Sequence, residues 1–132
     1  MNETLNRESL RIVVVDDSDF SRSLIIRMLS ETQFQVVGEA SGAAAALQII
    51  KEKKPNVVIT DIVMPEISGI ELTESINQNY SDVYVIVVSS LSQEHVVLEA
   101  IGAGAADFIA KPIQQQQLVD SLEKILSQMS KE

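Results

Sequence analysis

The sequence predicts an α/β fold: a doubly wound (βα)5 domain whose five parallel strands form one sheet with helices on both faces. Short runs of β-branched apolar residues alternate five times with longer segments whose apolar residues recur at helical spacing. Such alternation is typical of parallel strands joined by right-handed crossover helices. At 132 residues we expect one domain over residues 10–130, a polar, frayed tail over residues 1–9, and no output domain.

Composition narrows the class of protein. The net charge of -9 argues against nucleic acid and anionic membranes as partners, since both attract clustered Lys and Arg. The absence of cysteine excludes disulfides and thiolate chemistry and fits a reducing cytoplasm. No stretch approaches the roughly 18 apolar residues that span a bilayer. We therefore expect a cytoplasmic globular protein.

The first half of the chain predicts two strands and two helices. Residues 10–15 form a β-branched run, and residues 34–38 mix polar and apolar residues as an edge strand does. Ser18 or Asp19 is expected to cap the first helix, whose apolar stripe is Phe20, Leu24, Ile25, Met28 and Leu29. The second helix opens at Ser41 and ends at Pro55, with lysines in its last turn that suit the helix dipole.

The second half predicts three strands and three helices. The strands are residues 57–61, 83–88 and 106–110, of which the first two read as buried on both faces. A helix over about residues 70–77 faces inward with Leu72, Thr73 and Ile76. Ser92 is expected to cap the next helix, whose inward residues are Val96, Val97, Ala100 and Ile101. The last helix carries a stripe of Leu118, Leu122, Ile125, Leu126 and Met129.

Four of the predicted strands end in polar side chains: Asp16 and Asp17, Asp61, Ser89 and Ser90, and Lys111. The carboxyl ends of parallel strands share one edge of the sheet, where ligands bind, so these side chains converge. Three carboxylates at such an edge repel one another and require positive charge. Lys111 supplies part of it, and oxygen ligands of this kind suit Mg²⁺. The alternative is a set of turn caps and ordinary ion pairs, and the single histidine, His95, is expected to be solvated.

A carboxylate, a divalent cation, a lysine and a hydroxyl around one pocket are the parts that phosphoryl transfer needs. The carboxylate attacks phosphorus, and the other three groups bind the equatorial oxygens. The order and spacing of these parts resemble a response-regulator receiver domain of the single-domain kind seen in chemotaxis and sporulation phosphorelay regulators. The matching segments are Val13-Val14-Val15-Asp16-Asp17, Asp61-Ile62-Val63-Met64-Pro65 with Gly69, Val87-Val88-Ser89, and residues 104–112.

The resemblance implies a flavodoxin-like strand order, 2-1-3-4-5, and a role for each matching residue. Asp61 matches the phosphoacceptor, and Asp17 matches the direct Mg²⁺ ligand, with Asp16 holding the metal through water. Val63 matches the position whose backbone carbonyl completes the metal shell. Lys111 matches the family's lysine, whose bond to the following proline, here Pro112, is cis in the family. Ser89 matches the mobile hydroxyl and is preferred to Ser90 because it comes first after the strand. Phe108 matches the aromatic switch position, and a plain core role is the alternative for it.

The implied function is a switch in two-component or phosphorelay signalling. Asp61 would take a phosphoryl group from a histidine kinase or a phosphotransfer protein in a Mg²⁺-dependent reaction, catalysed by the protein itself without a separate enzymatic output. The face formed by the fourth helix, the fifth strand and the fifth helix would then change its affinity for a protein target. The chain is expected to be a monomer or a weak, phosphorylation-linked dimer.

Three alternatives remain open at this point. The first is onward phosphotransfer from Asp61 to a histidine of another protein. The second is a haloacid-dehalogenase-type phosphatase, suggested by Asp17-Ser18-Asp19 but lacking that family's later acidic motif. The third is an interaction module that works without phosphorylation.

The sequence also lacks side chains that would favour fast hydrolysis of an aspartyl phosphate at Asp61. The residues two places after Asp61 and Ser89 are Val63 and Leu91, and neither side chain can orient a water molecule. We therefore expect a long-lived aspartyl phosphate.

Overall fold

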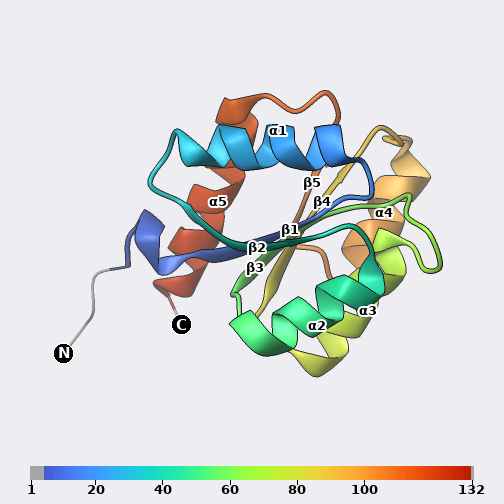
Figure 1. Ribbon diagram of the computed structural model, residues 1–132, viewed down its shortest axis with the longest axis horizontal. Coiled ribbons are helices and arrows are strands. Elements are labelled where there is room, and N and C mark those ends of the chain that lie inside the picture. The colour runs from blue at the N-terminus through green and yellow to red at the C-terminus, as the bar shows by residue number, and fades with distance from the viewer. Residues whose placement is uncertain (1–4, 132) are drawn as a thin grey trace.

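The structure is a computed structural model that describes residues 5–131 (Figure 1). A short 3-10 helix (Arg7–Ser9) precedes five strands and five helices in strict alternation. The elements are β1 (Arg11–Val15), α1 (Asp19–Ser30), β2 (Gln35–Ala40), α2 (Ala43–Lys53), β3 (Val57–Asp61), α3 (Gly69–Asn79), β4 (Tyr84–Ser89), α4 (Glu94–Gly102), β5 (Asp107–Ala110) and α5 (Gln115–Met129). Their boundaries lie within a few residues of the predicted ones, the usual uncertainty at frayed ends.

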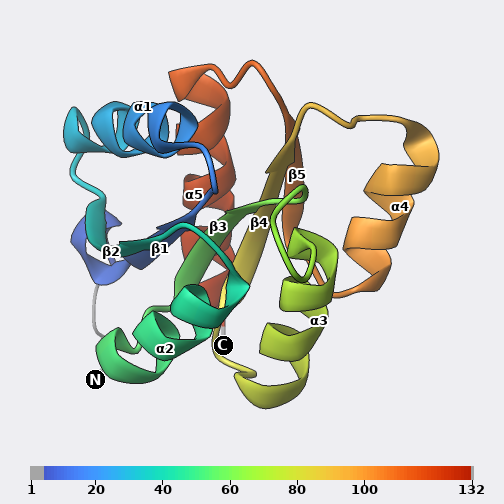
Figure 2. The ribbon, with the colours of Figure 1, turned by 45° about the vertical axis from the view of Figure 1, so that its right-hand side comes forward.

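The strands form one parallel sheet in the order β2-β1-β3-β4-β5, which confirms the predicted topology. α1 and α5 cover one face, and α2, α3 and α4 cover the other (Figures 1 and 2). Each strand therefore directs alternate residues into two separate cores. Along β1, Ile12 and Val14 pack toward α1 and α5, whereas Val13 and Val15 pack toward the opposite layer.

The predicted apolar stripe of α1 was partly wrong. Ile25 and Leu29 are buried, but Phe20 is 79% exposed and Leu24 38% exposed. Two neighbouring rows at four-residue spacing run along this helix, and the row through Ile25 and Leu29 is the more deeply buried. Of the other row, Met28 is half-buried and packs against the same core. Helical periodicity alone does not distinguish the two rows, because both carry apolar residues.

The start and the inward face of α4 also differ from the prediction. The N-cap is Gln93 rather than Ser92, and its side chain makes no capping hydrogen bond. Ala100 is buried, whereas Ile101 is 45% exposed. α4 lies beside β5, the last strand of the sheet, so it has fewer neighbours to cover its apolar residues. A hydrophobic helix at a sheet edge thus keeps part of its apolar surface in solvent.

Part of the segment expected to be a frayed tail is folded. Residues 1–4 lie outside the described residues, but Asn6 caps the 3-10 helix through a capping box. The Arg7 guanidinium pairs with Glu123 of α5 at 2.8 Å and lies 4.9 Å from the centroid of the Phe34 ring. These contacts join the start of the chain to α5 and to the entry of β2.

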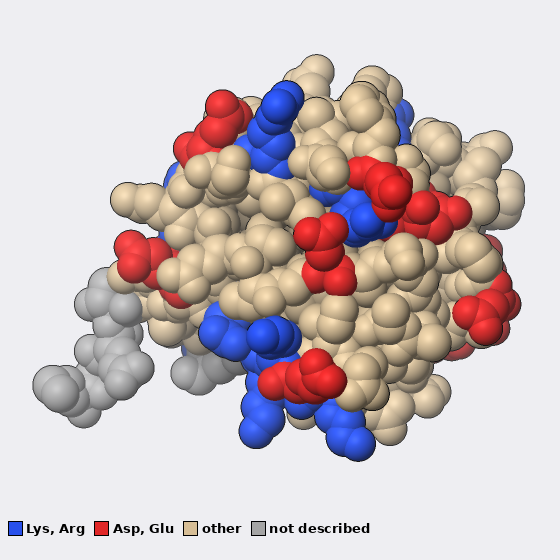
Figure 3. Space-filling model, in the orientation of Figure 1, with Lys and Arg blue, Asp and Glu red and all other residues tan. Residues whose placement is uncertain are grey.

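Basic side chains gather over α2 on the face shown in Figure 3. Lys51 and Lys53 occupy the last turn of this helix, and Lys54 is its C-cap in a left-handed conformation. Positive charge there offsets the partial negative charge of the free carbonyl groups. The lysines at the end of α2 are therefore explained by the helix dipole, as the sequence predicted.

Gly69 places the start of α3 directly against the end of β3. Its amide donates to the carbonyl of Ile62 at 2.8 Å. A Cβ at this position would overlap the carbonyl oxygen of Asp61 and lie 2.8 Å from its carbonyl carbon. Only glycine allows this close approach of two backbones.

We predict that Gly69→Ala destabilises the protein by about 1–3 kcal/mol, because the backbone at Asp61 must shift to admit the methyl group. Urea denaturation followed by circular dichroism measures the change. Gly102→Ala is the matched control, since a Cβ at Gly102 meets no heavy atom within 4 Å. Equal stability of the two variants would contradict the prediction.

Candidate functional site

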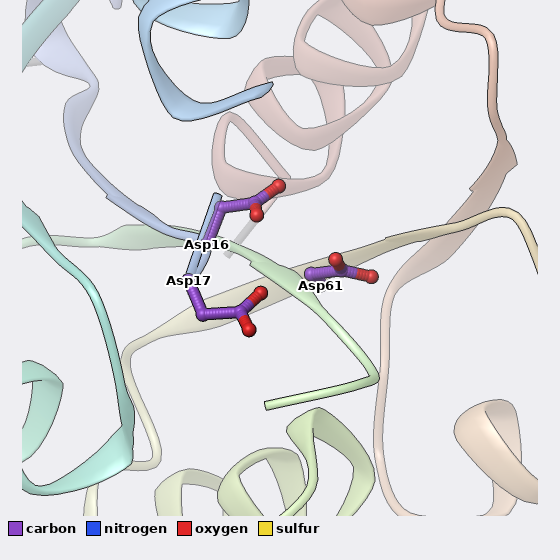
Figure 4. Close-up of side chains that lie close together, drawn as sticks. All are labelled: Asp16, Asp17 and Asp61. Atoms are coloured by element: carbon purple, nitrogen blue, oxygen red, sulfur yellow. The ribbon is translucent and has the colours of Figure 1, made fainter. Parts of the chain in front are cut away.

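Three carboxylates meet at the carboxyl edge of the sheet, as the strand ends predicted (Figure 4). Asp16 and Asp17 follow β1, and Asp61 is the last residue of β3, the neighbouring strand. One carboxylate oxygen from each residue can be chosen so that all three atoms lie within 4.8 Å of one another. Asp16 is fully buried and Asp61 is 9% exposed, whereas Asp17 is exposed.

Lys111 reaches this cluster from the end of β5. Its Nζ donates to Asp16 Oδ2 and to Asp61 Oδ2, both at 3.1 Å, and to Ser21 Oγ at 2.9 Å. Burial by itself lowers the pKa of the Lys111 ammonium, but the hydrogen bonds to Asp16 and Asp61 outweigh it and raise that pKa. Lys111 is therefore a permanent cation at neutral pH.

Each buried carboxylate is also held by the backbone. Asp16 Oδ1 accepts from the amide of Ser18 at 2.9 Å, and Asp61 Oδ1 accepts from the amide of Ile62 at 2.7 Å. These bonds orient the acids before any ligand binds. They also show why Asp16 tolerates complete burial, since both of its oxygens have a donor.

The donor set fits Mg²⁺. The clustered side chains offer carboxylate oxygens from Asp16, Asp17 and Asp61, the ligand type that hard divalent cations prefer. Against three negative charges the cluster has one ammonium group in contact, that of Lys111. A divalent cation would neutralise the remainder.

The structure places the two candidate hydroxyls differently. Ser89 is buried at the end of β4, and its Oγ accepts from the amide of Leu91 at 3.0 Å. Ser90 is exposed and lines a groove beside Lys111. In this arrangement the Ser89 hydroxyl bonds to its own loop and not to the carboxylate cluster.

The structure also shows how far the remaining predicted residues are buried. Phe108 is half-buried and packs against the core on the α2–α4 side of the sheet. Val63 is 59% exposed and Leu91 39% exposed, so both apolar side chains are in contact with solvent. The Lys111-Pro112 peptide bond is cis, as the resemblance implied. His95 is exposed, in agreement with the expectation of a solvated side chain.

Two residues near the cluster were missed by reasoning from sequence. Ser21 accepts a hydrogen bond from Lys111, and Arg22 donates to the carbonyl of Asp16 at 2.7 Å. Arg22 also bonds Glu39 at 2.7 Å and Asp19 at 2.6 Å, and these side-chain hydrogen bonds raise the pKa of its guanidinium. Both residues lie one helical turn after the Asp16-Asp17 pair, but their targets depend on how α1 docks.

A sequence model described as the response regulator receiver domain matches residues 12–123. The chain belongs to the response regulator receiver family. It is 38% identical over 115 residues to the chemotaxis protein CheY of Thermotoga maritima, covering 87% of this chain and 96% of that protein. It is 39% identical over 117 residues to CheY of Bacillus subtilis, covering 89% and 98%. This membership is consistent with a response regulator of two-component signalling.

Solved structures agree with this assignment. The response regulator domain of Thermotoga maritima CheB superposes with a TM-score of 0.78 at 34% identity, covering 93% of this receiver and 97% of that chain. A chain in the CheX-CheY-BeF3-Mg complex of Borrelia burgdorferi gives a TM-score of 0.83 at 24% identity, covering 88% of each, which supports the fold. The matched family is the one that the motifs resemble, and not the haloacid dehalogenases. Among the described residues, no helix has the length and apolarity needed to cross a membrane.

We predict that Mg²⁺ stabilises this receiver domain through Asp17. At a Mg²⁺ concentration ten times the Kd, the free energy of unfolding should rise by about 1.4 kcal/mol, because the ion binds only the folded state. Asp17→Asn should remove this stabilisation. Asp82→Asn makes the same change of charge at an exposed position elsewhere and should keep the stabilisation. Thermal denaturation with and without Mg²⁺ measures both, and an unchanged response of Asp17→Asn would refute the assignment.

Proposed function

We propose that this receiver domain accepts a phosphoryl group on Asp61 in a Mg²⁺-dependent reaction and acts as a phosphorylation-dependent switch. The observation that carries the proposal is the position of Lys111, 3.1 Å from both Asp16 and Asp61, beside a cluster of three carboxylate ligands. A set of turn caps would not need a half-buried lysine that spans the ends of three different strands.

The proposed reaction is one displacement at phosphorus. A carboxylate oxygen of Asp61 attacks, a P–O bond forms, and the P–N bond of a phosphohistidine breaks, so that the imidazole leaves with the electron pair. The Ile62 amide keeps Asp61 oriented, and Lys111 offers an N–H donor to a phosphoryl oxygen. In the separate dephosphorylation step, the oxygen of a water molecule attacks phosphorus and the P–O bond to Asp61 breaks. The Asp61 carboxylate and inorganic phosphate are released, and the proton of the water passes to solvent. The protein's own residues thus catalyse both steps without a separate enzymatic output.

We assign the metal site to Asp16, Asp17, Asp61 and the backbone carbonyl of Val63. When bound, Mg²⁺ supplies charge compensation and orients the phosphoryl oxygens. The exposed Asp17 is the accessible ligand, whereas the buried Asp16 already bonds Lys111 and Ser18, which fits contact through water. The Borrelia burgdorferi structure contains CheY with BeF3 and Mg, and supports a site of this kind in the fold.

The proposed readout is the face formed by α4, β5 and α5. Ser89 ends the buried strand β4, and Phe108, in the neighbouring strand β5, packs in the same core cluster as Val96 and Ala100 of α4. Movement of Ser89 toward a phosphoryl group would therefore alter the packing of α4. Leu98 is 63% exposed on this helix, which gives a protein target apolar surface to bind.

Two kinds of partner follow from this function. The phosphodonor is a histidine kinase or a histidine phosphotransfer protein, and the receptor is a protein that prefers the phosphorylated α4-β5-α5 face. Onward transfer from Asp61 to a phosphotransfer protein is the second use of the same chemistry. We propose that the domain works in the cytoplasm as a monomer or as a weak, phosphorylation-linked dimer.

Incubation with acetyl phosphate and Mg²⁺ tests the phosphoacceptor. We expect intact mass spectrometry to show one added phosphoryl group, which requires Mg²⁺ and disappears in Asp61→Asn, because the amide is not a nucleophile at neutral pH. Asp82→Asn is the control for the change of charge and should be labelled like the wild type. An adduct that persists in Asp61→Asn would place the reaction elsewhere.

The apolar side chains of Val63 and Leu91 predict slow loss of the phosphoryl group. Val63 and Leu91 offer no group to orient an attacking water, so Val63→Asn should accelerate dephosphorylation several-fold. Ile101→Asn places the same amide at another exposed apolar position, on α4, and should leave the rate unchanged. The decay of the intact phosphoprotein mass measures the rate, and fast wild-type decay that Val63→Asn does not alter would refute this account.

A further inference from the structure

We propose that Ser21 is a positioning residue that fixes the Lys111 ammonium group between Asp16 and Asp61. The inference rests on the proposed function, since it assigns a role in phosphoryl transfer to a residue outside the carboxylate cluster. It stands on the geometry of Lys111 and on the place of Ser21 in α1.

The Lys111 ammonium has three N–H groups, and the structure gives each of them an acceptor. Two go to the carboxylates of Asp16 and Asp61 at 3.1 Å, and the shortest contact, at 2.9 Å, goes to Ser21 Oγ. These acceptors come from the residue that follows β1, from the last residue of β3 and from the first turn of α1. Because a lysine side chain has several rotatable bonds, three acceptors on separate elements are needed to hold its nitrogen at one point.

A closed ring of four hydrogen bonds runs through Ser21. The Ser18 amide donates to Asp16 Oδ1 at 2.9 Å, and the Ser21 amide donates to Ser18 Oγ at 3.2 Å. Lys111 closes the ring by donating to both Ser21 Oγ and Asp16 Oδ2. The N-cap of α1 therefore sets the position of Ser21, and Ser21 in turn sets the position of Lys111.

Ser21 is a polar residue in the inward row of α1. It lies four and eight residues before Ile25 and Leu29, which are 1% exposed and face the sheet. An apolar residue at this position would pack equally well but would leave the third N–H of Lys111 to solvent. Ser21 and Lys111 also share the wall of a groove of about 370 Å³, so water has access to that N–H if the hydroxyl is removed.

Ser21 acts through Lys111 and not as a nucleophile. Lys111 lies between two carboxylates as an ammonium group, so it cannot accept the hydroxyl proton. We expect Ser21 to keep one N–H of Lys111 away from solvent and the other two directed at the carboxylates of Asp16 and Asp61. Lys111 then meets a phosphoryl oxygen on Asp61 without a search through other rotamers.

The first test measures the Lys111 ammonium in the metal-free protein by ¹⁵N-detected NMR. An ammonium group with three acceptors exchanges its protons slowly, so the wild type should show a resolved signal that disappears in Lys111→Arg. Ser21→Ala should accelerate this exchange about tenfold, because one charged hydrogen bond is lost. Ser21→Thr should retain the signal, as should Ser23→Ala, which removes an exposed hydroxyl from the same helix.

The second test measures labelling of Asp61 by acetyl phosphate at saturating Mg²⁺. Ser21→Ala should slow the reaction roughly three- to tenfold with the Kd for Mg²⁺ unchanged, and Ser21→Thr should restore the rate. The positioning role would be overturned if the Lys111 ammonium of Ser21→Ala exchanged its protons as slowly as that of the wild type. It would also be overturned if Ser21→Thr were labelled as slowly as Ser21→Ala. Absence of any adduct in the wild type would instead overturn the proposed function, and the ammonium signal would still decide whether Ser21 positions Lys111.

Discussion

The site depends on one ammonium group that reaches across the sheet. Lys111 follows β5, which is two strands from β3 and three from β1 in the order β2-β1-β3-β4-β5. Neighbouring strands lie about 4.8 Å apart, so the carboxylates start roughly 10–14 Å away. A long, unbranched side chain is required to bridge this span, and Lys111 Nζ ends 3.1 Å from both Asp16 and Asp61. Without it, the fully buried Asp16 would be an uncompensated charge in the core, which is strongly destabilising.

The alternation of residues along each strand divides the chemistry between the two faces of the sheet. Val57 and Ile59 belong to the core under α1 and α5, and Asp61, two residues further, follows the same alternation. Asp61 accepts from Lys111, which also bonds Ser21 in the first turn of α1. Ser89 continues the other alternation, after Val85 and Val87, toward the layer that holds Phe108 and α4. Under the proposed switch, a displacement that starts at Asp61 would reach the α4 face through β4 and β5. Buried, fully packed strands transmit such a displacement because they have no free volume to absorb it.

Most of the fold, and the convergence of the charged residues, could be predicted from sequence. The meeting of Asp16, Asp17, Asp61 and Lys111 follows from β-branched runs that stop at polar residues, because parallel strands share one edge. The strand order came from the resemblance to receiver domains. The exposure of Phe20 and Ile101 could not be predicted, since an apolar residue obeys the same helical period whether or not a neighbour covers it. Ser21 was missed for a related reason: its partner lies 90 residues away, and the contact depends on the rotation of α1 about its axis.

The charge of the site suggests an order of events for the proposed phosphoryl transfer. Three carboxylates and one ammonium group give the cluster a net charge of -2, the sum of -3 and +1. A phosphoryl group brings further negative oxygens to Asp61 and would be repelled where water is partly excluded. Lys111 alone cannot reverse the sign, because its bonds to Asp16 and Asp61 are already made. Under the proposed function, a divalent cation would reach the exposed Asp17 first from solvent, and its binding there would precede the attack by Asp61.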